Sequence, residues 1–219
     1  MRSLALIVAI LVACVGAVAQ ANRPGAPASE KNPPAGSTVL PSDKHDGLTI
    51  SVDPYTDSQR AKDKFGKSAN PLPAGILPVE VFLTNETPHP LKVDLATVQL
   101  EVHFERGKQD LDWLSVRRVA TLIVHPGGVP ASPSERRFPI GIPTASKDKK
   151  VDSISEVLRP FALDSDVIPP LGKIHGFLFF NVSHDFEAAL QSSLYVPDVV
   201  VLPDKTPMMF FEVPLTRKK

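Results

Sequence analysis

Histidine is the side chain best suited to metal binding and to proton transfer near neutral pH, and this sequence holds six of them. Two histidines that stand two, three or four residues apart can share one face of a strand or helix and hold one metal ion. No pair here has such a spacing, and no cysteine accompanies them, so the sequence predicts no local metal site. A metal-binding protein with ligands from distant segments stays open as an alternative. The six histidines are His45, His89, His103, His125, His175 and His184.

Two pairs of closely spaced aspartates, Asp110 with Asp112 and Asp164 with Asp166, are the next candidates. Paired carboxylates can perform acid–base catalysis or bind Ca²⁺. Aspartate is also a common residue of turns and helix caps, and no glycine-containing calcium loop surrounds these pairs. We therefore predict that the four aspartates lie next to turns and act as turn or cap residues.

Nucleophilic catalysis has no local signature. No serine sits in a Gly-x-Ser-x-Gly motif. The stretch AKDKFGKS, residues 61–68, lacks both the first glycine and the preceding buried strand of a phosphate-binding loop. The sequence thus predicts no catalytic residue, no cofactor and no enzyme activity. The alternative is a hydrolase whose site is assembled from separate loops, for instance from Asp164 or Asp166 with His175 or His184.

The N-terminal stretch MRSLALIVAILVACVGAVAQ predicts export. Its apolar part is too short for a permanent membrane span, and Ala17-Val18-Ala19 supplies the small side chains of a signal-peptidase site. We expect residues 1–19 to be a signal peptide, cleaved between Ala19 and Gln20, and the mature protein to be periplasmic or extracellular. Alternatively, the preceding Leu11–Cys14 resembles a lipobox, and acylated Cys14 would anchor the chain to the outer membrane.

The charges balance, with 24 Lys and Arg against 24 Asp and Glu. Such a chain has no global field to attract nucleic acid or an anionic membrane. We therefore expect a protein or peptide of the cell envelope as partner, no nucleic acid, and a membrane only if Cys14 is lipidated. Residues 20–46 are rich in Pro, Ala and Ser, and we expect them to form a disordered linker.

Short alternating apolar segments dominate the rest of the chain, residues 47–215. The 23 prolines limit the length of every element. Helical spacing appears in a surface helix after Thr56 or Asp57 that stops at Gly66, and in two helices within an insertion at residues 113–165. We therefore predict one domain, an antiparallel Ig-like β-sandwich of about seven strands with two or three short inserted helices. Strands are expected around residues 48–52, 79–83, 91–95, 98–104, 174–180, 193–203 and 206–215.

The stretch Ile174–Phe180 is apolar at nearly every position, without a two-residue rhythm. This pattern predicts a strand that is buried on both faces and lies centrally in its sheet. Gly176 has no side chain, which indicates that another segment packs closely there.

Two segments carry a family resemblance: LPVEVFLTNETPHPLKVDLATVQLEV (77–102) and VIPPLGKIHGFLFFNV (167–182). Their turn and packing residues resemble those of secreted bacterial immunoglobulin-like, telokin-like domains. The resemblance implies a fold and a compartment and brings no catalytic residue with it, because that family consists largely of binding, envelope or unassigned proteins. We expect contacts through the central loop or through a sheet edge to which an extended peptide could add a strand. The residues that carry the resemblance are Asn85, Thr87, Pro90, Pro170, Gly172, Gly176 and Phe179.

Overall fold

The computed structural model describes residues 40–104, 107–126 and 149–216. The predicted signal peptide with its cleavage site at Ala19 and Gln20, the alternative lipidation site Cys14, and much of the long central loop lie outside these residues. Within the described ranges, no helix has the length and apolar character needed to cross a membrane.

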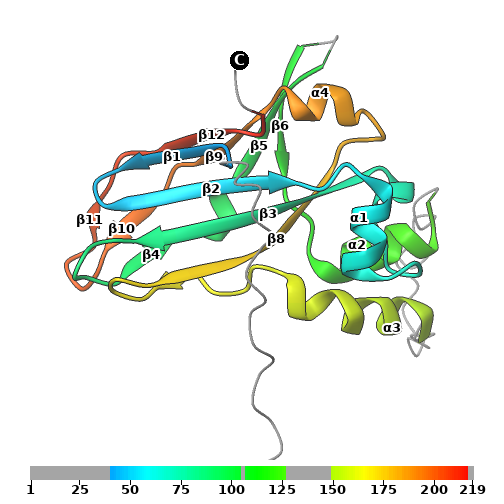
Figure 1. Cartoon of the computed structure of the whole chain (residues 1–219), viewed down its shortest axis with the longest axis horizontal. Helices are drawn as coiled ribbons and strands as arrows, with labels where there is room; N and C mark the ends of the chain where they lie inside the picture. Colours follow the sequence, from blue (N-terminus) through cyan, green and yellow to red (C-terminus); the bar gives the residue numbers. More distant parts are fainter. Residues whose placement is uncertain (1–39, 105–106, 127–148, 217–219) are drawn as a thin grey trace, which may run out of the picture. The chain divides into compact units, whose positions relative to one another are not determined.

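The described chain is mainly β and forms three antiparallel sheets of four strands each (Figure 1). The first sheet has the order β1 (Ser42–His45), β2 (Leu48–Pro54), β3 (Ile76–Asn85), β8 (Lys173–Asn181). The second has the order β11 (Thr206–Pro207), β10 (Val199–Val201), β4 (Leu91–Val93), β7 (Val167–Ile168). The third has the order β12 (Phe211–Pro214), β9 (Ser193–Val196), β5 (Gln99–Phe104), β6 (Gly107–Asp112).

Four α-helices occur in the described ranges: α1 (Ser58–Phe65), α2 (Val116–Val124), α3 (Lys149–Leu158) and α4 (Phe186–Leu190). The predicted surface helix is confirmed as α1, in which the Asp57 side chain accepts a hydrogen bond from the Arg60 N–H and Gly66 ends the helix at a φ of 81°. The two inserted helices are confirmed as α2 and α3. Short 3₁₀ turns add η1 (Leu72–Ala74), η2 (Leu95–Thr97) and η4 (Arg159–Phe161).

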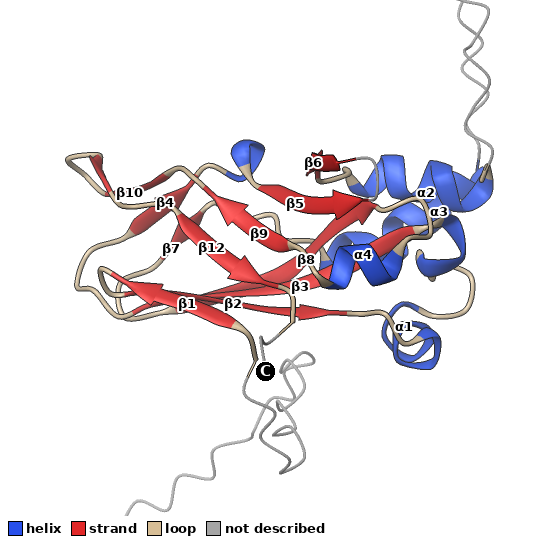
Figure 2. Ribbon diagram, turned by 90° about the horizontal axis from the view of Figure 1, so that it is seen from above, coloured by secondary structure: helices blue, strands red, loops and turns tan. Residues whose placement is uncertain are grey.

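The first sheet lies opposite strands of the other two sheets (Figure 2). Residues from the facing strands form the main hydrophobic cluster. Alternation in β2 sets this arrangement, because Leu48, Ile50 and Val52 point inward and are fully buried. The structure has more strands than the seven predicted, because the segments around residues 193–203 and 206–215 are each divided into two strands, and β1, β6 and β7 are additional. β1 lies within the predicted linker, and β6 lies where the sequence indicated turns.

A second hydrophobic cluster lies between the outer face of the first sheet and the helices α1, α2 and α3. Phe177 and Phe179 of β8 point into it, whereas Leu178 and Phe180 point into the main cluster. The Phe65 ring of α1 packs edge-on against Phe177, with ring centroids 4.9 Å apart. Helices thus cover one end of a sheet face. The prediction of burial on both faces is confirmed for residues 176–180, whereas His175, in the same predicted stretch, is exposed.

The predicted central position of this strand is wrong, because β8 is the end strand of the first sheet. Its outer edge is covered by irregular backbone instead: the N–H of Leu114 donates to the Phe179 carbonyl and that of Leu163 to the Phe177 carbonyl. Leu163 passes so close that only a glycine fits at position 176. The sequence inference about Gly176 is therefore confirmed, and the covering segment is what permits an end strand to be buried.

Candidate binding surfaces

Strand β6 forms an open edge of the third sheet. It pairs with β5 through six residue pairs, from Gln99 with Asp112 to Phe104 with Gly107, and no other strand in the described ranges pairs with it. Every residue of β6 except Leu111 is exposed. Only beyond the end of the strand does Trp113 form a bridge to Phe180. Backbone groups along the outer edge of β6 can therefore pair with an added strand.

Acidic side chains mark the outward face of this edge. Glu101 and Asp110 stand directly opposite each other, an arrangement that destabilises a strand pair unless a cation relieves it. Lys108 lies 2.9 Å from Glu101, and the hydrogen bond to that carboxylate raises the pKa of the lysine. Asp112 accepts a hydrogen bond from the Gln99 amide, at 2.9 Å. The edge thus keeps a net negative charge, and the prediction that Asp110 and Asp112 lie next to turns is wrong, because both belong to β6.

A second group of polar residues surrounds Glu80 on the outer face of the first sheet. Glu80 is 6% exposed and its carboxylate accepts a hydrogen bond from the Tyr55 hydroxyl at 3.0 Å. The Lys64 ammonium and the His175 ring nitrogen Nδ1 each lie 3.5 Å from the same carboxylate. A buried carboxylate is tolerated when such partners satisfy it. The sequence did not predict this cluster.

Helix α1 is held on the sheet by this cluster and by a neighbouring ion pair. Both terminal nitrogens of Arg60 donate to the Asp53 carboxylate of β2. The same guanidinium lies 3.7 Å from the centre of the Tyr55 ring. Paired and stacked charges of this kind fix α1 in place, so we assign the Glu80 cluster a structural role.

Burial of Tyr55, reinforced by the nearby Glu80 carboxylate, raises the pKa of its phenol from 10.0 to about 12. A folded-state pKa above the unfolded one means that the folded chain holds the phenolic proton more tightly. The stability gained in this way is fully present below pH 10 and is lost as the pH rises toward 12. We expect the urea midpoint of unfolding to fall over this range, and to fall less in Tyr55→Phe. Tyr195→Phe is the control, and its urea midpoint should decline with pH as much as that of the unaltered chain. An equal decline in the two variants would contradict the assignment of the raised pKa to Tyr55.

The residues of the hydrolase alternative are not joined in the structure. Asp166 forms an ion pair with Lys92 at 3.3 Å, and His175 contacts Glu80. The His184 nitrogen Nε2 lies 3.2 Å from the Pro73 carbonyl. No hydrogen bond or ion pair connects Asp164 or Asp166 with either histidine. In the described part of the chain, no three His, Cys, Asp or Glu side chains come together as a metal site would require.

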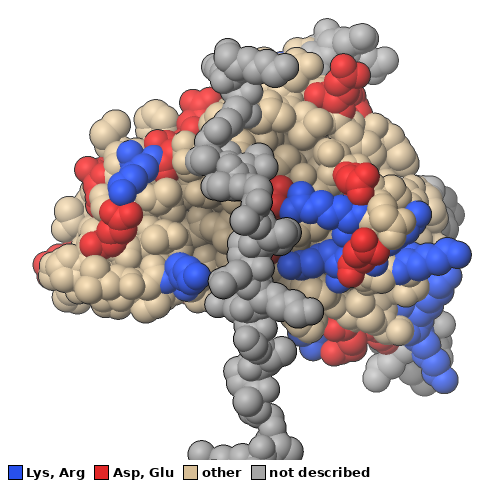
Figure 3. Space-filling model, viewed as in Figure 1, with Lys and Arg blue, Asp and Glu red and all other residues tan. Residues whose placement is uncertain are grey.

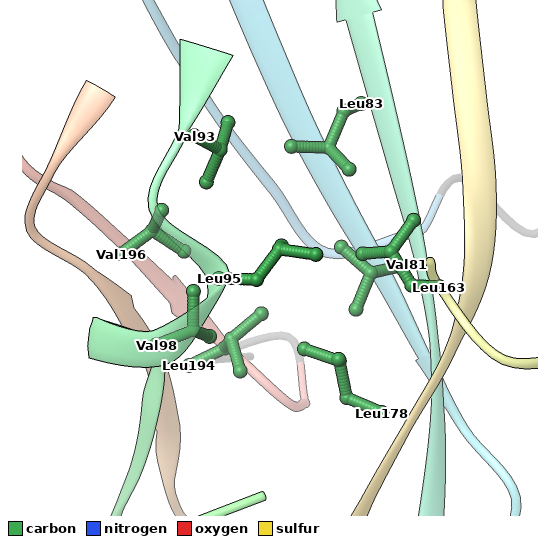
Figure 4. A pocket seen from close by; sticks show the side chains of 9 residues that line it. All are labelled: Val81, Leu83, Val93, Leu95, Val98, Leu163, Leu178, Leu194 and Val196. Atoms are coloured by element: carbon green, nitrogen blue, oxygen red, sulfur yellow. The ribbon is translucent and has the colours of Figure 1, made fainter. Parts of the chain in front are cut away.

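An apolar cavity lies between the sheets, with side chains from both layers pointing into it (Figure 4). The centre of a water-sized sphere can reach about 10 Å³ of it. One water molecule would barely fit and would find no polar side chain to bind, so the cavity is a packing defect rather than a ligand site. Its lining is Val81, Leu83, Val93, Leu95, Val98, Leu163, Leu178, Leu194 and Val196.

Comparisons with known proteins add no relative. No protein-family model matches this chain, and searches of curated proteins and of solved structures find no match either. The resemblance to telokin-like domains therefore stays a hypothesis.

Proposed function

We propose that this chain is an exported Ig-like β-sandwich module that binds an extended segment of a cell-envelope protein and catalyses no reaction. The open edge of β6 carries this proposal, since it offers a row of backbone donors and acceptors to a further strand. The predicted signal peptide supports a periplasmic or extracellular location, with anchoring through Cys14 as the alternative.

The charge and alternation of β6 define the partner. Side chains of an added strand would lie opposite those of β6, at about 5 Å between Cβ atoms. Positions on the outward face would meet Asp110 and Asp112, which favours Lys or Arg there. Positions between them would lie beside the partly buried Leu111, which favours apolar residues. The preferred partner is therefore an extended peptide with alternating basic and apolar residues.

A capped heptapeptide of alternating Lys and Val tests this proposal directly. We expect it to bind the chain and to bind about tenfold more weakly to the double variant Asp110→Lys, Asp112→Lys, because the charge complementarity is reversed. Titration calorimetry, or the change in Trp113 fluorescence at the end of β6, measures the affinity.

Two controls separate strand addition from general attraction between charges. The double variant Asp198→Lys, Asp204→Lys makes the same change in net charge at exposed positions flanking β10 and should keep the affinity of the unaltered chain. The peptide methylated at every backbone nitrogen keeps its charges, but its backbone cannot donate hydrogen bonds, so its binding should be lost. Equal binding of both peptides, or equal losses in both double variants, would refute strand addition at β6.

A further inference from the structure

Charges that balance over the whole chain are strongly segregated in the fold. The segments of α1, α2 and α3 with their flanking residues, 57–67, 115–125 and 149–159, hold nine basic and four acidic residues. We call this group of three helices the helical end. The other described residues hold five basic and sixteen acidic residues. The helical end is therefore a cationic part of a domain that is otherwise anionic.

The three helices form one surface because they share the second hydrophobic cluster. Ala61 and Phe65 of α1, Val119 of α2, and Ile154 and Leu158 of α3 are all buried in it. Apolar faces directed inward leave the charged faces of the same helices directed outward. Figure 3 shows Lys and Arg side chains gathered over this part of the domain, at the right of the view. Segments far apart in the sequence thus contribute to one cationic surface.

Part of this positive charge is already used within the domain. Arg60 pairs with Asp53, Lys64 with Glu80, and Arg117 with Asp152. Four further cations are exposed and have no ion pair with a described residue. These four are Lys62, Lys67, Arg118 and Lys149.

We infer that the helical end adsorbs to an anionic lipid bilayer. Three of the four cations belong to three neighbouring helices, the fourth lies just after α1, and all are exposed. Such a spread of charges suits a broad array of headgroups better than a single bound anion. Val157, the next-to-last residue of α3, is 42% exposed and adds an apolar contact on the same helix. This inference goes beyond peptide binding at β6 and does not depend on it.

Binding to vesicles tests the inference. The probe is a bilayer of phosphatidylcholine with about 30 mol% phosphatidylglycerol, compared with phosphatidylcholine alone. The chain should start at Gln20, because the apolar leader would itself insert, and every residue named in the two hydrophobic clusters lies after it in the sequence. We expect flotation with the anionic vesicles in dilute buffer, and release at about 0.5 M salt, where screening acts within a few ångströms.

The decisive variants remove four positive charges in two different places. Replacing Lys62, Lys67, Arg118 and Lys149 with Gln should weaken the binding at least about a hundredfold, since each cation near an anionic surface contributes roughly fivefold. The matched control replaces Lys44, Lys92, Lys173 and Lys205 with Gln; these residues lie outside the helical end, and the net charge changes by the same amount. This control should bind within about threefold of the unaltered chain.

Three outcomes would overturn the inference. Equal losses in the two quadruple variants would mean that net charge and not the helical end decides binding. Flotation with phosphatidylcholine alone would mean that headgroup charge has no part in it. Binding to soluble polyphosphate without binding to the anionic vesicles would assign the surface to a polymer instead of a bilayer. Unchanged circular dichroism of the two quadruple variants would show that a loss of vesicle binding comes from the removed surface charges and not from unfolding.

Discussion

Gly176→Ala is expected to destabilise the fold by about 3 kcal/mol or to prevent folding, although it adds one methyl group to a strand. A Cβ at position 176 would lie 2.6 Å from both Cα and N of Leu163, and 2.9 Å from the carbonyl carbon of Ala162. These neighbours are backbone atoms, which cannot swing aside as a side chain would. The segment at Leu163 must therefore move, and the hydrogen bond from the Leu163 N–H to the Phe177 carbonyl is lost.

Gly66→Ala is the matched control, because it is the same chemical change without the close approach. Gly66 has a φ of 81° and no atom would lie within 4 Å of an added Cβ. Only the backbone conformation, with φ 81° and ψ 160° in a region that glycine favours, opposes alanine there, which costs at least about 1 kcal/mol. Urea unfolding followed by circular dichroism compares the two variants. Equal destabilisation in both would show that packing against Leu163 does not explain the glycine.

Local pattern was sufficient to predict elements whose side chains alternate or whose ends carry caps. Leu48, Ile50 and Val52 gave β2 its buried face, and Asp57 with Gly66 gave α1 its two ends. These signals act over a few residues, so a single sequence contains them in full.

Strand β6 was missed because nothing in GKQDLD alternates in hydrophobicity except the single Leu111. Its conformation comes from the hydrogen bonds to β5, and pairing between strands is a tertiary property. The same reason explains why Asp110 and Asp112 were assigned to turns, where aspartate is most common.

The Glu80 cluster and the helical end depend on contacts between residues that are far apart in the sequence. Glu80 follows the alternation of a strand whose outer face would meet water, and only the packing of α1 against that face buries it. The one available signal was the opposing strand, where Phe177 and Phe179 on the same face indicated a cover. The net charge of the whole chain does not reveal the separation of basic from acidic residues, because that separation appears only when α1, α2 and α3 come together.

Asn85 is the buried polar residue with the most complete hydrogen bonding in the described structure. It is 1% exposed, and its amide nitrogen donates to the carbonyls of His89 and Pro169, at 2.8 and 3.0 Å. Its amide oxygen accepts from both the backbone N–H and the hydroxyl of Thr87, at 2.8 and 2.7 Å. One side chain thus joins the turn after β3 to the loop before β8, and these are the two segments that carry the family resemblance.

Asn85→Asp should therefore destabilise the fold by about 4 kcal/mol at neutral pH, because it buries a charge beside two carbonyl oxygens that need donors. Those carbonyls raise the pKa of the new carboxyl above that of the unfolded chain. The variant's stability relative to the unaltered chain should thus recover as the pH falls, when the protonated acid donates one hydrogen bond again. Asn181→Asp is the control, since Asn181 is exposed and its side chain only accepts, from the N–H of Ser183. Urea midpoints at about pH 4 and pH 8 measure both effects, and an Asn85→Asp variant as stable as Asn181→Asp at the higher pH would show that this network does not hold the two loops together.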